Sequence, residues 1–269
     1  MKIRKILSAV SAAAMALTLT ACNDKLPEIT PLESLNMGSS SSKTSSSSKI
    51  SSELSNSSES KTEEQQTEYD YLPSGNEICL LKYWGKSSSV EIPSSIDGKS
   101  VTEITGTFCD CVGITSVTIP DSVMIIGKST FSGCTSLTSV VIPDSVSEIS
   151  QYAFKNCTGL INITLPNGIT KIEDDTFCGC TSLSSVTIPN SVTEIGWNSF
   201  SDCTGLSSVT VPDSVTIIGG SAFSGCTGLS SVIIPDSVTE IWEDAFKDCT
   251  ATITYKGKTY TPENYSELY

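Results

Sequence analysis

The 269-residue chain contains no histidine, and its 16 Lys and Arg residues are far outnumbered by 30 Asp and Glu residues. The absence of histidine excludes a Ser–His or Cys–His nucleophile pair, and it removes the commonest protein ligand of transition metals. The net charge of −14 leaves no basic patch to replace the counterions of nucleic acid, so we predict no nucleic-acid partner. The chain also shows no phosphate-binding loop or metal motif. We therefore predict a protein that is not an enzyme and uses no cofactor.

Long apolar runs are absent except near the N-terminus. Lys2, Arg4 and Lys5 precede an alanine-rich apolar run over residues 6–19. The run is short for a membrane span and is typical of an export signal. It ends in Leu19-Thr20-Ala21-Cys22, which resembles a bacterial lipobox. The resemblance implies a signal peptide over residues 1–21, lipidation of Cys22, and an exported protein anchored to the extracellular face of the cell membrane. The alternative is an ordinary secretion signal with a chance cysteine.

Residues 22–69 contain too few apolar side chains to form a core. Residues 39–60 are almost entirely serine, with lysine and glutamate between. Low hydrophobicity with mixed charge is typical of a solvated, disordered segment. We predict a tether that holds a folded domain close to its membrane.

Phenylalanine is scarce, and its seven copies form a ladder with a step of 23 residues. Cysteine and proline form parallel ladders with the same step. The three ladders are Phe108, Phe131, Phe154, Phe177, Phe200, Phe223 and Phe246; Cys111, Cys134, Cys157, Cys180, Cys203, Cys226 and Cys249; and Pro120, Pro143, Pro166, Pro189, Pro212 and Pro235. A fixed period of this length predicts a repeat solenoid, because no single repeat can bury its own apolar face.

One repeat, residues 139–161, predicts the local structure of all of them. Residues 140–142 are β-branched and alternate in sidedness, so they predict a short strand that Pro143 ends. A turn at Asp144-Ser145 leads to a second short extended segment over residues 146–149. Ala153-Phe154 predicts a single helical turn. The residue two positions after each Phe is always Gly, Asn or Asp, which predicts a left-handed backbone conformation at that column.

The repeat resembles the leucine-rich repeats of the BspA-like surface-protein family, whose units read roughly L-x-x-V-x-I-P-x-x-V-x-x-I-x-x-x-A-F-x-x-C. Residues 89–250 match this pattern in every copy. The resemblance implies a curved leucine-rich-repeat solenoid of about seven repeats, mostly short parallel strands and loops with short helical or 3₁₀ turns. It also implies a place on bacterial surface proteins, often in adhesion or ligand binding.

The segments that flank the repeats predict caps over the open ends of the solenoid. Residues 70–88 carry a turn signal at Ser74-Gly75-Asn76 followed by a strand, and the first repeat contains an inserted turn signal at Asp97-Gly98. Residues 251–269 begin with an alternating segment around Lys256-Gly257 that predicts a hairpin.

The cysteines and the acidic column each have two interpretations. Matched cysteines on successive repeats would lie about 4.8 Å apart with parallel Cβ vectors, which disfavours disulfides and favours small buried apolar side chains. Cys109-Asp110-Cys111 and Cys178-Gly179-Cys180 could bind a metal, but structural zinc sites prefer wider spacing. The residue after each Pro is Asp or Asn, which could form a calcium stripe; capping of a turn explains it better. We predict no metal site.

Two outward columns are candidate binding surfaces. The first is a Thr/Ser grid that could match an ordered surface, although Val141 and Ile233 interrupt it. It consists of Thr118, Thr164, Thr187 and Thr210, flanked by Ser116, Ser139, Asn162, Ser185, Ser208 and Ser231. The positions just before each Phe vary most, and exposed aromatic rings beside carboxylates suit contact with sugar or protein. The candidate ligand-binding residues there are Tyr152, Asp174, Asp175, Trp197, Trp242 and Glu243.

The favoured hypothesis is a membrane-anchored surface lipoprotein that presents a non-catalytic module to an extracellular protein or glycan. A surface-matching protein that uses the Thr/Ser face and an accessory module of an extracellular enzyme system are the alternatives.

Overall fold

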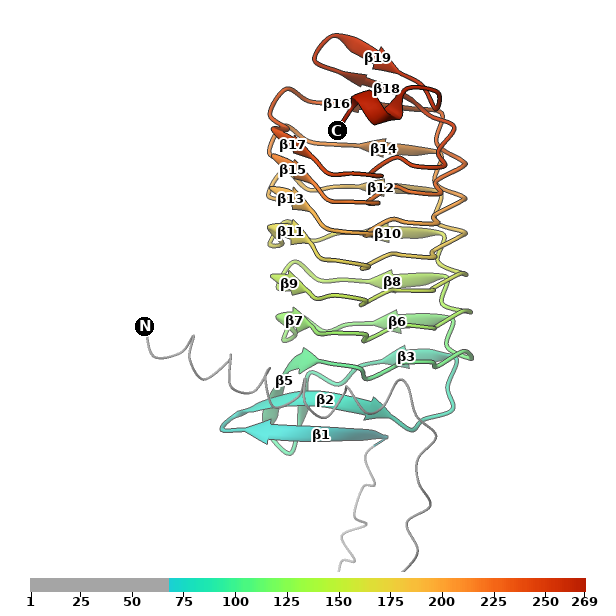
Figure 1. The fold of residues 1–269 in the computed structure, drawn as a ribbon. Helices are drawn as coiled ribbons and strands as arrows, with labels where there is room; N and C mark the ends of the chain where they lie inside the picture. The colour runs from blue at the N-terminus through green and yellow to red at the C-terminus, as the bar shows by residue number, and fades with distance from the viewer. Residues whose placement is uncertain (1–67) are drawn as a thin grey trace, which may run out of the picture.

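The structure is a computed structural model that describes residues 68–269, so the predicted signal peptide, Cys22 and nearly all of the predicted tether lie outside the described residues. The described part is a β-solenoid in which each 23-residue repeat makes one coil, and the coils stack along a single axis (Figure 1). The predicted repeat solenoid is therefore confirmed. Within residues 68–269, no helix has the length and apolar composition needed to cross a membrane.

Each coil carries two short strands that line up in two columns, and most matched strands of successive coils pair in parallel. The first column is β3 (Ser89–Glu91), β6 (Ser116–Thr118), β8 (Ser139–Val141), β10 (Asn162–Thr164), β12 (Ser185–Thr187), β14 (Ser208–Thr210), β16 (Ser231–Ile234) and β18 (Thr252–Tyr255). The second is β5 (Lys99–Ile104), β7 (Ile125–Ile126), β9 (Glu148–Ile149), β11 (Lys171–Ile172), β13 (Glu194–Ile195), β15 (Ile217–Ile218) and β17 (Glu240–Ile241). Between the regular coils the register equals the 23-residue period, as in Thr187 opposite Thr210, whereas Ser89 lies opposite Ser116 near the N-terminal end and Ser231 opposite Thr252 at the C-terminal end. The pairing is interrupted between β8 and β10, between β14 and β16, and between β9 and β11.

Hairpins close both ends of the solenoid at the predicted turn signals. At the N-terminal end, β1 (Tyr69–Ser74) and β2 (Glu77–Tyr83) form an antiparallel hairpin, and β2 pairs with β5. The inserted Asp97-Gly98 turn joins β4 (Ser95–Ile96) to β5. At the C-terminal end, β18 turns through Lys256-Gly257 into β19 (Lys258–Tyr260), and a 3₁₀ helix, η1 (Tyr265–Glu267), follows.

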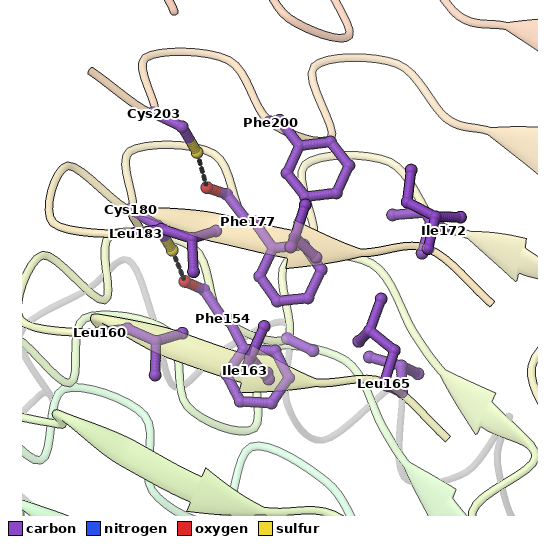
Figure 2. Packing of buried hydrophobic residues seen from close by; sticks show 14 of the residues in the cluster. Phe154, Leu160, Ile163, Leu165, Ile172, Phe177, Cys180, Leu183, Phe200 and Cys203 are labelled. Atoms are coloured by element: carbon purple, nitrogen blue, oxygen red, sulfur yellow. Dashed lines mark hydrogen bonds between the residues drawn. The ribbon is translucent and has the colours of Figure 1, made fainter. Parts of the chain in front are cut away.

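The phenylalanine ladder is a continuous stack of fully buried rings along the solenoid axis. Neighbouring centroids lie 5.1–5.4 Å apart, and the ring planes differ by at most 14°. Figure 2 shows Phe154, Phe177 and Phe200 in this stack, beside Leu160, Ile163 and Leu165. Tyrosines end the stack at both caps. The ring centroid of Tyr83 lies 5.3 Å from that of Phe108, and the ring centroid of Tyr265 lies 6.5 Å from that of Phe246. The caps thus give each terminal ring an aromatic neighbour.

The segment around each Phe is not the helical turn that we predicted. The backbone N–H groups of Tyr152, Phe154 and Asn156 donate to carbonyls of the next coil, at Asp174, Thr176 and Cys178. Because these N–H groups point along the solenoid axis, they cannot form a helix within their own coil. Stacking between coils thus overrides the local helical preference.

The left-handed column is confirmed at all seven positions, with φ between 57° and 75°. It alternates strictly between Asp or Asn and Gly along the axis, an order whose meaning the sequence did not reveal. A Cβ atom on Gly179 would lie 2.4 Å from Oδ1 of Asn156 in the preceding coil, so glycine leaves room for the neighbouring side chain. A second left-handed column, two residues before each Phe, was not predicted; it includes Tyr152 and Asp175.

The ladder cysteines are free thiols, and six of the seven are buried, while Cys111 in the first repeat is only partly buried. They are more than small apolar groups. Each buried thiol donates to the carbonyl of the Phe in the preceding coil, for example Cys180 to Phe154 at 3.1 Å and Cys203 to Phe177 at 3.2 Å (Figure 2). A hydroxyl at these positions would therefore have an acceptor, contrary to the picture of a purely apolar site.

Candidate functional site

The predicted binding residues lie on one strip of the surface. We define the variable strip as the residues two to four positions before each Phe, from residues 150–152 to residues 242–244. The strip follows the second strand of each coil, and backbone hydrogen bonds join its successive coils. Tyr152 donates to Asp174, Asp175 to Trp197, Asn198 to Gly220, and Ser221 to Glu243. The structure thus brings all six candidate residues together across five consecutive coils.

Trp197 and Trp242 form an exposed aromatic pair on this strip. Their ring centroids lie 5.7 Å apart, the planes are inclined by 44°, and the side chains are 50% and 47% exposed. The two residues do not occupy equivalent columns, because Trp197 stands three positions before its Phe and Trp242 stands four positions before its own. They also belong to coils that are not adjacent, so the contact could not be inferred from the period.

The coil between the two tryptophans carries Gly219 and Gly220 on the strip. A Cβ atom on Gly220 would lie 2.7 Å from Cζ3 and 2.8 Å from Cε3 of Trp197, so the indole of Trp197 occupies the place of the missing side chain. Gly220 thus allows indoles from two coils apart to meet. Gly219 instead packs on the backbone of the preceding coil, where an added Cβ atom would lie 2.7 Å from the carbonyl carbon of Gly196. Sequence reasoning did not assign these glycines to the site. The sequence does contain a signal for Gly220, because glycine stands there in a column that holds Gln151, Asp174 and Glu243 in other coils.

Tyr152 marks the other end of the strip. It has a φ of 62° in a column that otherwise holds Gly, Ser, Asp or Asn, a conformation that costs a bulky residue on the order of 1 kcal/mol. The ammonium groups of Lys128 and Lys155 lie 5.2 and 5.1 Å from its ring centroid. Lys155 also pairs with Asp175 at 2.9 Å. The ring is therefore held between two cations and is only partly exposed.

The three predicted carboxylates have different surroundings. Asp174 accepts hydrogen bonds from the backbone N–H of Trp197 at 2.9 Å and from Nε2 of Gln151 at 3.3 Å, so it organises the strip. Asp175 is engaged by Lys155. Glu243 is exposed and makes no side-chain hydrogen bond or ion pair within residues 68–269, so it is available to a ligand.

The second candidate surface is the outward column of the first strands. Thr118, Thr164, Thr187 and Thr210 are exposed and in register, as the grid hypothesis requires. Val141 and Ile233 in the same column are 64% and 73% exposed and interrupt the hydroxyl pattern. The column is regular in geometry but mixed in chemistry.

The buried thiols are poor candidates for chemistry. Desolvation raises the pKa of Cys157 and of Cys203 to about 12, which keeps both protonated and unreactive at neutral pH. In the described part of the chain, no three His, Cys, Asp or Glu residues gather closely enough to hold a metal ion. The Asp and Asn column after each Pro therefore has no second set of ligands among residues 68–269.

Comparison with known proteins places the repeats in a defined group. Residues 102–230 and 195–265 match the family model described as BspA type leucine rich repeat region, in six copies. A leucine-rich repeat protein of T. pallidum has a similar structure, with 35% identity and a TM-score of 0.60 over 65% of this chain and 83% of that one. A leucine-rich repeat protein of Bacteroides ovatus has 28% identity and a TM-score of 0.64 over 70% of this chain and 52% of that one. No curated protein matches the chain.

Proposed function

Because the chain belongs to the family of BspA-type leucine-rich repeat regions, we propose that it is a non-catalytic binding module carried by an exported, lipid-anchored bacterial surface protein. The lipobox-like Leu19-Thr20-Ala21-Cys22 supports the anchor, and the serine-rich segment after it supports a tether. The partner is an extracellular protein or glycan that contacts the variable strip.

The exposed Trp197–Trp242 pair is the observation that carries this proposal. A solenoid needs its inward columns for stability, whereas the fold does not dictate the residues of its outward columns. Large apolar side chains that stay exposed in an outward column therefore indicate a contact surface. Tryptophan combines a large apolar face with a polar N–H and is enriched where proteins bind partners. Here two indoles remain half exposed although they contact each other.

Binding is tested with the full chain, purified in detergent, on arrays of extracellular-matrix proteins and of glycans. We expect selective binding by the wild-type protein and its loss in the Trp197→Ala/Trp242→Ala variant. Trp84→Ala is the matched control, because Trp84 is also exposed but lies near the N-terminal hairpin. If the wild-type protein binds no member of either array, or if the double variant binds as the wild type does, the proposal is wrong.

The anchor is tested separately by Cys22→Ala. We expect the wild-type protein to be cleaved before Cys22 and to partition with membranes, and the variant to remain an uncleaved precursor or become soluble. A mature variant that still partitions with membranes would contradict the lipid anchor and leave the binding proposal intact.

The register of the exposed threonines supports a second candidate, a surface that matches an ordered polymer or ice. Thr187→Lys, in the centre of the grid, should abolish binding to crystalline polymer under this hypothesis and should leave the Trp197–Trp242 surface unaffected. Equal binding of variant and wild type to such a surface would remove this candidate.

A further inference from the structure

We propose that the Trp197–Trp242 pair, with the intervening Gly219-Gly220, is a subsite for a neutral oligosaccharide. This inference rests on the proposed binding function and specifies the class of ligand. We call the four residues the indole platform.

The platform depends on three successive coils at once. Trp197 supplies one ring, the next coil leaves room for that ring at Gly220, and the coil after that supplies Trp242. Neither glycine has a positive φ, so the backbone conformation does not demand glycine there. The space taken by the indole of Trp197 explains Gly220. Gly220 and Trp242 lie 23 and 45 residues after Trp197, and both are needed for the two indoles to meet, which indicates a surface shaped for a ligand.

The geometry suits saccharide rings. The C–H faces of a pyranose stack on an exposed aromatic face, and hydroxyl groups at the ring edge need polar partners beside it. Because the two indoles are inclined by 44°, they present two separate faces, one for each of two units in a chain that turns. Glu243 lies beside Trp242 with an exposed, unpaired carboxylate that can accept from a sugar hydroxyl.

The charge around the platform selects neutral sugars. The described carboxylates on this part of the strip include Asp174, Glu243 and Asp244. Two cations beside it are already paired, Lys247 with Asp244 at 3.0 Å and Lys171 with Glu194 at 3.0 Å and with Glu173 at 3.4 Å. Sialylated or sulfated glycans would meet net negative charge here. The two lysines around Tyr152 stand toward the other end of the strip.

The size of the platform argues for a saccharide over a protein surface. Among the large exposed apolar residues of the described chain, only Trp197 and Trp242 lie on the strip. A stable protein interface usually buries about 800 Å² on each partner around an apolar centre. Two half-exposed rings with polar neighbours provide much less than this, but they are enough for one or two sugar units.

The experiment titrates the full chain in detergent with neutral and with anionic oligosaccharides. Binding is measured by calorimetry and by the quenching of tryptophan fluorescence. We expect binding of neutral oligosaccharides that is roughly ten-fold weaker in Trp197→Ala and in Trp242→Ala, the loss of one stacking contact. Gly220→Gln introduces the side chain that Gln151 has in the same column, and it should displace the indole and weaken binding to a similar extent.

Trp84→Ala controls for the loss of an exposed indole elsewhere, and the melting temperature of each variant controls for folding. Binding of proteins only, of anionic glycans only, or of neutral glycans with wild-type affinity in both Gly220→Gln and Trp197→Ala would overturn the saccharide subsite. The first two outcomes would leave the proposed binding function standing. Absence of binding to any protein or glycan would overturn both.

Discussion

Phe177 and Asp174 are three residues apart in the chain, but they belong to regions that follow different rules. Phe177 is fully buried and stacks at 5.3–5.4 Å on identical residues above and below. Asp174 lies in a column that contains Gln, Asp, Trp, Gly and Glu. The inward column repeats because each ring is the packing surface for the next, so a change in one coil affects both neighbours. The variable strip has no such constraint, and its side chains can meet a ligand.

Alkaline pH should affect the inward column most, because many thiols act together. Unfolded thiols lose their protons near pH 9, whereas Cys157 and Cys203 keep theirs to about pH 12 because they are desolvated. Above pH 9 the unfolded state therefore binds fewer protons, and stability falls by about 1.4 kcal/mol per pH unit for each such thiol. Below pH 9 this contribution is fully present.

Urea unfolding between pH 7 and pH 11 measures this dependence. Above pH 9, the unfolding free energy of the Cys157→Ala/Cys203→Ala variant should fall less steeply with pH than that of the wild type, by roughly 2.7 kcal/mol per pH unit. Tyrosine ionisation affects both proteins alike. Identical slopes in the variant and the wild type would show that the thiols are not the cause.

Replacing one ring of the stack should have the next largest effect. Phe177→Ala should lower the free energy of unfolding by about 3–5 kcal/mol, the usual loss for a buried aromatic side chain. Phe246→Ala should cost less, because its outer neighbour is the tilted ring of Tyr265 at 6.5 Å. Chemical denaturation of both variants tests this, and equal losses would contradict a stack whose stability depends on neighbours on both sides.

A single ladder thiol should matter less. Cys203→Ala removes a hydrogen bond of 3.2 Å to the carbonyl of Phe177. Because this carbonyl still accepts from the N–H of Cys180, we expect the free energy of unfolding to fall by only about 1 kcal/mol. Cys203→Ser retains a donor and should cost no more than Cys203→Ala. A markedly larger loss for serine would argue against the thiol–carbonyl bond. Mass spectrometry after alkylation without reduction should detect no disulfide-linked ladder peptides.

The variable strip should contribute least to stability. Trp197→Ala removes a half-exposed ring, and we expect the free energy of unfolding to change by less than about 1 kcal/mol, although ligand binding is weakened. Thermal unfolding of Trp197→Ala beside Phe177→Ala gives the comparison directly. A loss for Trp197→Ala close to that for Phe177→Ala would mean that the indole belongs to the core, and the contrast between the two regions would disappear.

The sequence by itself determined the period, the two strands of each coil, the inward Phe and Cys columns, the left-handed column after each Phe and the hairpin turns at both ends. These features depend on backbone preferences of Gly, Asn, Asp and Pro and on burial that repeats every 23 residues, so they are visible in one repeat.

Contacts between coils were decided by the tertiary structure. Alternate N–H groups around Phe154 bond to the next coil, so single tight turns replace the predicted helical turn. The thiol of Cys180 finds the carbonyl of Phe154 only when the coils stack. The meeting of Trp197 and Trp242 needs the space that Gly220 leaves in the coil between them and depends on residues that break the repeat. A period describes what the coils share, whereas the candidate site consists of the positions at which they differ.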